Sequence, residues 1–383
     1  MQVQEGEIMK KKVVVGMSGG VDSSVSAILL QKQGYEVIGL FMRNWDSLAD
    51  GELDGPTTST GQCPQEADYD DAKAVCDKLG IPLYRKDFVK EYWDYVFTYF
   101  LDELKNGRTP NPDIMCNKYI KFDMFAKEAR KLGADYIATG HYARMNNGHL
   151  LRGIDSNKDQ TYFLSQINNE QISSCLFPLG DIDKPKVREI AKELNLNVAD
   201  KKDSTGVCFI GERNFKEFLK NYIPANKGKI IDINSNEVVG EHDGVMYYTI
   251  GQRKGLGIGG ISGREPRSWF VCYKDVKNNI LYVADEKEDE HLFSDRAIIK
   301  NINWLAERTN DPLHVGCKFR YRQQDNGVTL KFIDDDTIEL IFDEPYKAVT
   351  TGQAAVFYMG TRMLGGGIIE EIYYKGKRID IKK

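Results

Sequence analysis

The sequence predicts an α/β fold with a doubly wound parallel sheet, followed by small domains that consist mainly of β-strands. From residue 13 to about residue 200, short apolar runs alternate with segments of helical period, which is the pattern of strands joined by crossover helices. From residue 229 onward, β-rich segments are punctuated by glycines and spaced as in small β-domains. We therefore expect three domains, over residues 1–211, 212–284 and 285–383.

The first expected strand and helix enclose a glycine-rich turn. An apolar run at residues 13–17 predicts a buried strand, and apolar side chains recur at helical spacing over residues 21–29. The glycines between them allow a tight turn, and the free N–H groups at the positive end of the helix dipole favour a bound phosphate. Further hydroxyl donors are those of Ser18, Ser23 and Ser24. The turn therefore predicts an anion site, although Gly-rich turns without a ligand are common in α/β folds.

A loop of the G-x-x-x-x-G-K-[ST] kind carries a lysine directly after its second glycine. Here Val21 and Asp22 open the helix instead. The site therefore fits another phosphate geometry.

The remaining elements follow in order. Expected strands are 36–42, 81–88, 135–139 and 150–154, and expected helices are 66–79, 92–104, 118–132, 161–166, 184–194 and 214–222. The polar stretch from Arg43 to Cys63 predicts a long loop. The aromatic side chains of helix 92–104 are expected in the core. Gly140 and His141 follow a predicted strand, at the sheet edge where open α/β sheets bind ligands. His141 could bind a nucleotide or a base, and a hydrogen-bonded histidine at the end of a strand is an equal alternative.

Two of the seven cysteines lie in settings that favour a thiolate. Pro110 and Pro112 predict an extended loop that ends near Cys116, which places this thiol at or near a helix N-terminus. Cys208 lies in KKDSTGVCFIGER, close to basic side chains. The other cysteines are interpreted as packing residues: Cys63, Cys76, Cys175, Cys272 and Cys317. A small buried hydrophobe stays an alternative for Cys116 and Cys208 as well, and neither has the C-x-x-C spacing of structural zinc.

Charge and hydropathy bound the class of protein. The 383 residues carry a net charge of −5, which gives no global attraction to nucleic acid. Residues 201–230 hold seven basic and three acidic side chains, which is compatible with one nucleic-acid contact face or with a solvated helix face. No apolar run has the length of a membrane span, and the first residues have no signal-peptide core. We expect a cytoplasmic protein with no membrane partner.

The motifs resemble a known family. SGGVDSS resembles the pyrophosphate loop (PP-loop) of the ATP pyrophosphatases. Together with RTPNPDIMCNKYIKF, ATGHYAR, KDQTYFLSQ, KKDSTGVCFIGERNFKEFL, YYTIGQRKGLGIGG and GQAAVFY, it is similar to the tRNA-specific 2-thiouridylase family, MnmA or TrmU, nearly end to end. The resemblance implies a PP-loop domain, a small central domain and a C-terminal β-barrel that contacts tRNA. The residues before the first strand and the loop from Ser47 to Gly61 carry no recognisable family motif.

The resemblance also implies an activity and its site. ATP and Mg²⁺ would be used to adenylate O2 of the wobble uridine, U34, in tRNAs for Lys, Glu and Gln. The implied nucleotide-binding residues are Gly16, Met17, Ser18, Gly19, Gly20, Val21, Asp22, Ser23, Met42 and Gly140. Cys208 would carry a persulfide from a sulfur-donor protein, and Cys116 would release it through a transient disulfide. Asp113 would act as acid or base, or is simply a turn-forming residue after Pro112.

By the same analogy, tRNA or its flipped base would contact Asn111, Pro112, Asp113, His141, Lys158, Asp159, Gln160, Arg320, Tyr321 and Gln353. Two other function classes stay open. One is another ATP pyrophosphatase that acts on a small molecule and needs no cysteine pair. The other is a tRNA-binding adaptor without catalysis. An Fe–S cluster held by the two cysteines and Asp113 is an alternative to the persulfide.

Overall fold

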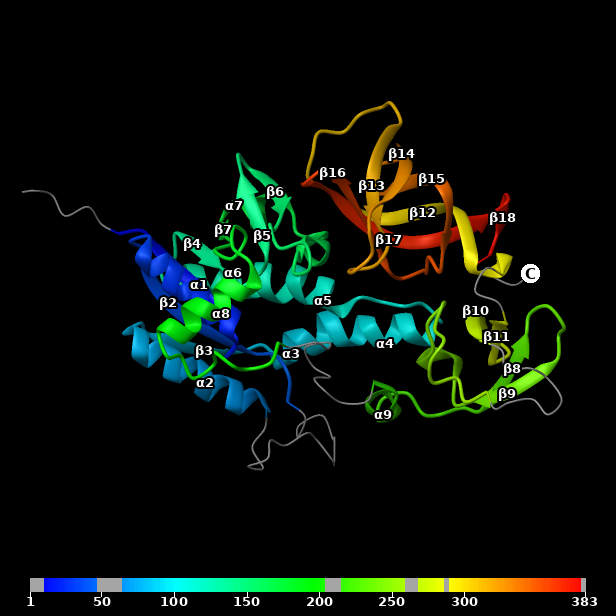
Figure 1. Cartoon of the computed structure of the whole chain (residues 1–383), viewed down its shortest axis with the longest axis horizontal. Coiled ribbons are helices and arrows are strands. Elements are labelled where there is room, and N and C mark those ends of the chain that lie inside the picture. The colour runs from blue at the N-terminus through cyan, green and yellow to red at the C-terminus, as the bar shows by residue number, and fades with distance from the viewer. Residues whose placement is uncertain (1–9, 47–63, 204–214, 259–267, 286–288, 380–383) are drawn as a thin grey trace, which may run out of the picture. The chain divides into compact units, whose positions relative to one another are not determined.

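The computed structural model describes residues 10–46, 64–203, 215–258, 268–285 and 289–379. The chain divides into two compact units (Figure 1). The first contains residues up to 93 and residues 116–205, and the second contains residues 94–115 and those from 206 onward. The expected domain limits after residues 211 and 284 lie in or next to stretches outside the described ranges and stay predictions.

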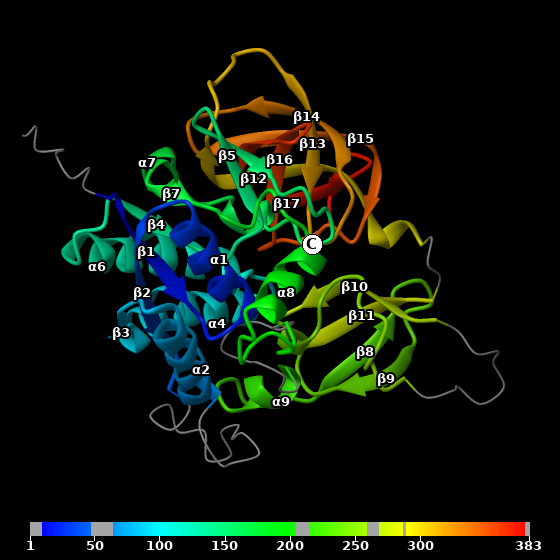
Figure 2. The ribbon, with the colours of Figure 1, turned by 60° about the vertical axis from the view of Figure 1, so that its left-hand side comes forward.

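The first unit is built on a parallel sheet with the strand order β3-β2-β1-β4-β7. Its strands are β1 (Lys12–Met17), β2 (Glu36–Arg43), β3 (Leu83–Asp87), β4 (Tyr136–Ala138) and β7 (Cys175–Leu176). All neighbouring strands pair in parallel. The order reverses between β1 and β4, and ligands bind at such a switch point in open α/β sheets. The predicted doubly wound α/β class is confirmed (Figure 2).

Helices connect and cover the strands of this unit. They are α1 (Val21–Lys32), α2 (Pro64–Leu79), α3 (Val89–Tyr92), a π-helix η2 (Cys116–Met124), α6 (Phe125–Lys131), a 3₁₀ helix η3 (Thr161–Leu164), α7 (Asn169–Ser173) and α8 (Lys184–Glu193). A hairpin of β5 (Ala143–Asn146) and β6 (His149–Arg152) follows β4.

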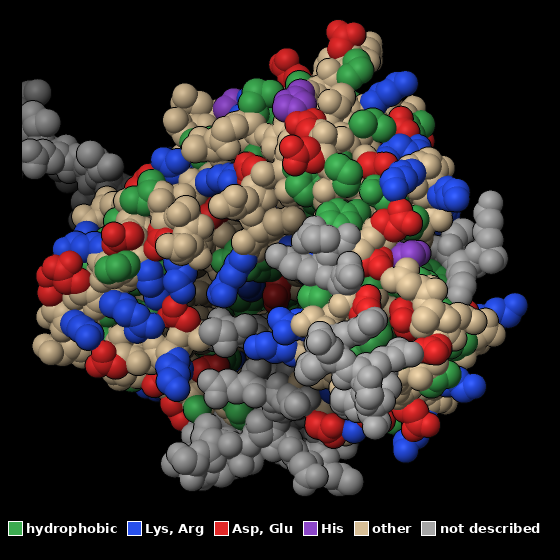
Figure 3. All heavy atoms as spheres, turned by 45° about the vertical axis from the view of Figure 1, so that its right-hand side comes forward, with side chains coloured by type: hydrophobic (Ala, Val, Ile, Leu, Met, Phe, Trp, Pro, Cys, Tyr) green, Lys and Arg blue, Asp and Glu red, His purple; other side chains and the backbone are tan. Residues whose placement is uncertain are grey.

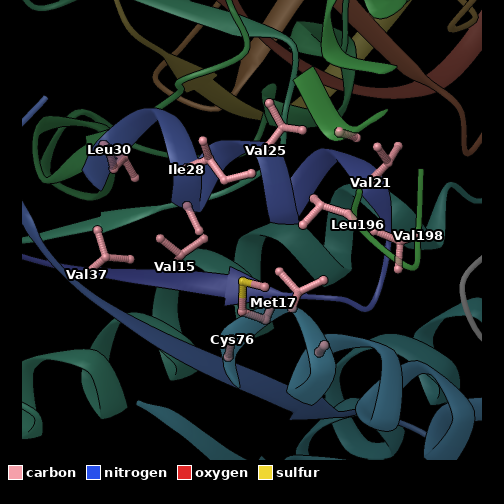
Figure 4. Close-up of a cluster of buried hydrophobic side chains, with 14 of the residues drawn as sticks. Val15, Met17, Val21, Val25, Ile28, Leu30, Val37, Cys76, Leu196 and Val198 are labelled. Atoms are coloured by element: carbon pink, nitrogen blue, oxygen red, sulfur yellow. The ribbon is translucent and has the colours of Figure 1, made fainter. Parts of the chain in front are cut away.

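The core of the first unit joins segments far apart in the chain. Figure 4 shows Met17 of β1 near Cys76 of α2, while Val21 and Val25 of α1 lie in the same cluster. Val198, which follows α8, is also fully buried there. Each Å² of apolar surface that folding removes from water stabilises the protein by about 25 cal/mol. This packing holds the turn between β1 and α1 at a fixed place on the sheet edge.

One sequence expectation about the segment before Cys116 is wrong. Helix α5 (Pro112–Met115) runs directly into η2, so the helical stretch is continuous from Pro112 to Lys131. Proline is favoured at the first helical position because its missing N–H has no intrahelical partner there. The expected extended loop thus ends at Pro112, and Cys116 lies one turn inside the helix, where the effect of the helix dipole falls off.

The second unit begins with the chain segment 94–115. It contains α4 (Thr98–Lys105), which follows the π-helix η1 (Trp93–Phe97), and then the segment that leads into α5. The expected core position of the aromatic residues holds for Tyr92 and Phe100 but fails for Tyr95, which is 46% exposed. After α9 (Phe215–Lys220), the chain forms a small β-domain.

This small domain has a four-stranded sheet with the order β10-β11-β8-β9. The strands are β8 (Gly228–Asp232), β9 (Val238–His242), β10 (Phe270–Asp275) and β11 (Ile280–Ala284). The β-rich character expected from residue 229 onward is wrong for the described part of VMYYTIGQRKGLGIGG. A short 3₁₀ helix η4 (Val245–Tyr247) and turns occupy residues 245–258, because the three glycines in this stretch favour turns over a ladder.

The C-terminal strands close into an antiparallel barrel. Its order is β12-β15-β14-β13-β16-β17, and β17 pairs back to β12. The strands are β12 (Phe293–Trp304), β13 (Leu313–Lys318), β14 (Asn326–Phe332), β15 (Thr337–Lys347), β16 (Ala354–Met359) and β17 (Arg362–Tyr374), preceded by the 3₁₀ helix η5 (Glu290–Leu292) and followed by β18 (Lys377–Arg378). Closure of the barrel pairs the backbone N–H and C=O groups that the edge strands of an open sheet would leave unpaired. The predicted C-terminal β-barrel is confirmed.

Candidate active site

The turn between β1 and α1 has the geometry of an anion cradle. Gly19 has a φ of +69°, and a Cβ at this position would lie 2.1 Å from the backbone oxygen of Asp68. Gly20 is the N-cap of α1, and no side chain caps this helix end. The N–H groups of the first turn are therefore available to a ligand. The residues fit a bound phosphate group.

The hydroxyls of Ser23 and Ser24 both bond to the backbone of the turn, and Ser23 Oγ donates to Gly20 O at 3.1 Å. Ser23 Oγ accepts a hydrogen bond from Ser18 N at 3.2 Å and lies 3.2 Å from Ser18 Oγ, so these two side chains face each other across the turn. Ser24 is fully buried, and its hydroxyl donates to Gly20 O at 2.8 Å. The helix backbone thus uses the hydroxyls of both Ser23 and Ser24, and their role toward a ligand stays a prediction.

The structure brings the expected nucleotide-binding residues together at the carboxyl edge of β1, β2 and β4. A Cβ on Gly16 would lie 3.4 Å from the terminal methyl of Met42, and a Cβ on Gly140 would lie 3.1 Å from Ser23 N. Glycine at both positions thus permits close approach of these neighbours. Met17 and Val21 are buried beneath the turn.

Asp22 is held by two side chains that the sequence analysis did not single out. Its Oδ1 accepts hydrogen bonds from Tyr142 Oη at 2.8 Å and from Lys184 Nζ at 2.7 Å. Burial raises the pKa of Tyr142, and the Asp22 carboxylate raises it further, so the phenol keeps its proton and donates it. Tyr142 stands in ATGHYAR, one residue beyond His141, which was the only available sequence signal.

Lys184 also joins Asp22 to a second carboxylate. Its Nζ lies 2.8 Å from Asp203 Oδ1, and its side chain is only 9% exposed. Lys158 and Arg188 bind the same carboxylate at 2.6 and 2.8 Å. Burial alone would raise the pKa of Asp203, but the hydrogen bonds from Lys158 and Lys184 outweigh it and lower the pKa to about 2.

Asp203 is the last described residue before the segment that contains Cys208. Cys208 lies outside the described residues. The chain leading to the expected sulfur carrier is nevertheless tied to the nucleotide turn through Lys184. Asp203 stands in KKDSTG, which was the sequence signal for this anchor, but it was counted only as one of the acidic residues of 201–230.

Lys201 fixes the other side of the turn. Its Nζ donates to Gly19 O at 2.9 Å and pairs with Asp68 at 2.7 Å and Asp71 at 2.6 Å. Burial would lower the pKa of Lys201, but the two carboxylates outweigh it and raise the pKa. Lys201 is thus a structural cation of the first unit, whereas Lys216 pairs with Asp243 in the second. These pairs weaken the interpretation of residues 201–230 as one free basic face.

His141 is buried beside the π-helix that begins at Cys116. Its Nδ1 lies 2.8 Å from Thr139 Oγ1, and its ring is 5.7 Å from that of Phe122. Burial lowers the pKa of His141 well below its usual value, and the charge of Lys121 lowers it further. The imidazole is therefore neutral at pH 7 and suits hydrogen bonding to an uncharged base or ribose.

Cys116 is 1% exposed at the start of η2. Its neighbour Asn117 donates from Nδ2 to Phe163 O at 3.0 Å, which fastens this helix to η3. π-Helical turns are frequent at functional sites. Burial raises the pKa of the Cys76 thiol to about 12 and also raises those of Cys175, Cys272 and Cys317, so these thiols are inert packing groups at neutral pH, as expected. Cys63 lies outside the described residues.

The expected tRNA residues of the first unit are engaged inside the protein. Lys158 binds Asp203, Gln160 Oε1 accepts from Tyr142 N at 3.1 Å, and Asp159 is 5% exposed with its Oδ1 accepting from Thr161 Oγ1 at 2.9 Å. Their role toward tRNA stays a prediction.

In the second unit, α5 begins with Pro112 and Asp113, and Asn111 directly precedes it. Asn111 Oδ1 accepts from Ile114 N at 3.3 Å, and Pro112 is buried. Arg320 donates to Ala348 O at 2.8 Å and to Thr350 Oγ1 at 3.3 Å. Gln353 N donates to Thr350 O at 3.3 Å. Arg320 and Gln353, both expected to contact tRNA, are therefore hydrogen-bonded to the same residue. Tyr321, partly exposed, follows Arg320 in a turn.

Surface charge, metal ligands and hydropathy add three observations. Acidic and basic side chains are interspersed over the face drawn in Figure 3. Within the described ranges, no three His, Cys, Asp or Glu side chains form a group that could hold a metal ion. None of the helices in those ranges is both long and apolar enough to span a bilayer.

Comparisons with known proteins agree with this architecture. Residues 11–212 match the model of the tRNA methyl transferase HUP domain, residues 216–285 that of the tRNA methyl transferase PRC-barrel domain, and residues 294–369 that of the aminomethyltransferase beta-barrel domain. The tRNA-specific 2-thiouridylases MnmA of Bacillus cytotoxicus and Bacillus anthracis are each 54% identical over 374 residues, which is 96% of this chain and 97% of theirs.

Among solved structures, a 4-thiouridine synthetase–RNA complex with bound ATP has a TM-score of 0.33 and 15% identity, over 50% of this chain and 43% of that one. This likeness is too low to carry an argument about the site.

A parallel-sheet domain with an anion-binding turn, followed by a PRC-barrel domain and a closed β-barrel, defines a tRNA-modifying enzyme. The domain descriptions name methyl transfer, but the match over nearly the whole chain is to thiouridylases. The chain belongs to the tRNA-specific 2-thiouridylase family, MnmA, whose members are tRNA sulfurtransferases.

Proposed function

We propose that this protein uses ATP, with Mg²⁺, to place sulfur at C2 of the wobble uridine, U34, of tRNAs for Lys, Glu and Gln. The observation that carries the proposal is the link between Asp22 and Asp203. Lys184 binds both carboxylates, so the anion-binding turn and the chain that leads to Cys208 are held in one ionic cluster. An ATP pyrophosphatase that acts on a small molecule has no need to join its nucleotide turn to a cysteine segment.

The proposed chemistry has two stages. In the first, O2 of the uracil attacks the α-phosphorus of ATP, and pyrophosphate leaves. This step is needed because the C2 oxygen is a poor leaving group, whereas AMP is a good one. The cradle at Gly19 and Gly20 would bind the phosphates through backbone N–H groups, and the neutral ring of His141 would bind at the junction of nucleotide and base.

In the second stage, the terminal sulfur of a persulfide on Cys208 attacks C2, and AMP departs with the oxygen. The thiolate of Cys116 then attacks the Cys208 sulfur of the C2-bound disulfide. The new Cys116–Cys208 disulfide forms, and the thiouridine leaves with the transferred sulfur. Asp113 would take up and return the protons of these steps. A sulfur-donor protein must restore the persulfide after the disulfide is reduced.

The target base must leave its stack to reach this site. Anticodon loops are single-stranded, and proteins recognise them through loops, aromatic side chains and local contacts more than through global charge. Such recognition is compatible with a net charge of −5. Asn111 and Pro112 would meet the base, with Lys158, Asp159, Gln160, Arg320, Tyr321 and Gln353 as the further tRNA contacts.

The two cysteines give a direct test. Cys116→Ser and Cys208→Ser should each abolish 2-thiouridine formation, while ATP binding and tRNA-dependent release of pyrophosphate persist. The matched control is Cys175→Ser, because the Cys175 thiol donates to Gln171 O at 2.9 Å and a serine hydroxyl can make the same bond. The measurement is mass analysis of tRNA nucleosides, with pyrophosphate release followed in parallel. Full thiolation by either variant would reject the sulfur-transfer assignment.

The other function classes give different results in the same assay. An adaptor would release no AMP or pyrophosphate, and a small-molecule pyrophosphatase would release them independently of tRNA. Ser18→Ala and Asp22→Ala should remove the tRNA-dependent release. An Fe–S cluster would give visible absorbance in anaerobically purified protein, whereas the persulfide mechanism gives none.

A further inference from the structure

The loop that precedes the expected base-binding residues packs directly on a turn of the β-barrel. Thr109 N donates to Thr351 O at 2.9 Å. Gly352 has a φ of +87°, and a Cβ there would lie 2.9 Å from Thr109 N and 3.0 Å from Arg108 Cβ. The two backbones are therefore in contact, with no room for a side chain between them.

Arg108 fastens this loop to the barrel through its charge. Its Nε lies 2.7 Å from Glu103 Oε2, on α4, and one of its terminal nitrogens lies 2.9 Å from Glu370 Oε2, on β17. The same nitrogen donates to Ile369 O at 3.4 Å. The side chain is 18% exposed. A planar guanidinium can bind two carboxylates at once, which a lysine ammonium on a flexible stem does poorly.

The barrel turn, residues 350–353, contains one expected tRNA residue, Gln353, and contacts another, Arg320. Thr350 receives hydrogen bonds from Arg320 and from the backbone of Gln353. Gly352 N donates to Ile369 O at 2.9 Å, and Ile369 N donates to Gln353 O at 2.9 Å. Ile369 O thus accepts from both the turn and Arg108. One short turn joins the tRNA contacts to the base loop.

We propose that Arg108 is a positioning residue for thiolation, which holds Asn111, Pro112 and Asp113 in register with the barrel turn 350–353. This inference rests on the proposed function and adds a residue to it. Asn111 lies three residues after Arg108, and the chain between them is pinned at Thr109. Movement of a base-binding loop by about 1 Å can cost on the order of 100-fold in rate. Loss of the Arg108 side chain should therefore lower the reaction rate of bound tRNA more than it lowers the affinity for tRNA.

The experiment compares Arg108→Met and Arg108→Lys with Arg308→Met. Arg308 lies in the same unit and pairs with the exposed Asp335, so it matches the lost charge without touching the loop. For each variant, tRNA affinity and the single-turnover rate of pyrophosphate release at saturating tRNA and ATP are measured well below the melting temperature. Wild-type thiolation is established first.

Arg108→Met should lower the saturating rate at least tenfold and change the Kd for tRNA less than threefold. Arg108→Lys should recover part of the rate, because one carboxylate can still be bound. Arg308→Met should match the wild type in both readouts. A rate for Arg108→Met within twofold of wild type, or a loss seen only in tRNA affinity, overturns the inference. Absence of wild-type thiolation would instead reject the proposed function.

Gly352→Ala provides a second route that leaves every charge in place. The added methyl would press on Thr109, and the saturating rate should again fall while tRNA affinity holds. Gly360→Ala is the control, since Gly360 has a φ of +60° in the same barrel with no atom within 4 Å of the added Cβ. Equal rates for the two alanine variants would contradict the positioning role.

Discussion

Lys184 and Lys274 are both buried, but they differ in whether a carboxylate lies beside them. Lys184 has two carboxylates within 2.8 Å. Lys274, on β10, is 8% exposed and donates to Tyr248 O at 3.0 Å. In the described part of the chain, no carboxylate lies within ion-pair distance of it. Burial lowers the pKa of Lys274 to about 7.

Lys274→Met should stabilise the protein, and most strongly at or below pH 7. In the unfolded chain this lysine binds its proton up to about pH 10.5, whereas in the folded protein it releases it near pH 7. The folded state of the wild type therefore gains stability from this group as the pH rises from about 7 to about 10.5. Each pKa unit corresponds to about 1.4 kcal/mol, so the full penalty below pH 7 is on the order of a few kcal/mol.

The measurement is thermal unfolding between pH 6.5 and pH 9. The melting temperature of Lys274→Met should exceed that of wild type by several degrees at pH 6.5 to 7, and the difference should shrink toward pH 9. Lys277→Met, on the exposed turn after β10, is the control and should show no such trend. A constant difference across this range would mean that Lys274 does not titrate as the burial indicates.

At the scale of elements, the shape of the turn between β1 and α1 depends on α2 and on the segment after α8. Asp68 of α2 contacts the turn twice, through its backbone oxygen near Gly19 and through the ion pair of its carboxylate with Lys201. Lys201 in turn donates to Gly19 O. The turn is therefore shaped from outside as well as by its own glycines.

Gly19→Ala should abolish ATP binding. A left-handed backbone costs a non-glycine residue about 1–2 kcal/mol, and the methyl group would in addition meet Asp68 O at 2.1 Å. Gly80→Ala separates these effects, because Gly80 has a φ of +65° and open space around the added methyl. Calorimetric titration with Mg-ATP should give wild-type affinity for Gly80→Ala and at least a 100-fold loss for Gly19→Ala. Comparable affinity in both would show that the contact with α2 does not shape the cradle.

For the whole molecule, the two units carry different parts of the proposed reaction. The nucleotide turn and Cys116 belong to the first unit, whereas Asn111 to Asp113, Arg320 and Gln353 belong to the second. The unit limit falls between Asp113 and Cys116 along the chain. ATP should therefore stabilise the first unit locally, and tRNA contacts should reside largely in the second.

Hydrogen exchange with mass spectrometry tests this division. Mg-ATP at about 100 times its Kd stabilises the state it binds by about 2.7 kcal/mol. Exchange should slow over β1, α1 and β4, and peptides of barrel strands such as β14 and β15 should exchange as before. Ser18→Ala is the control that should lose the effect. Slowed exchange confined to the barrel would place the nucleotide elsewhere.

The sequence predicted those features that depend on neighbours along the chain. The strand ending at Met17, the turn at Gly19 and the helix from Val21 follow from local period and from glycine chemistry. Closely spaced motif residues could be named before any fold was known. The prediction failed at Pro112, where the rule that proline excludes helix was applied to the one helical position that favours proline.

By itself, the sequence determined the α/β class, the anion-binding turn and the identity of the two candidate cysteines, because each is encoded within a few consecutive residues. Only the tertiary structure decided which charges meet. Lys184 and Asp22 are 162 residues apart, and Arg108 and Ile369 are 261 apart. Such pairs are set by the strand order and the closure of the barrel, which bring distant segments together and which no local pattern in the chain specifies.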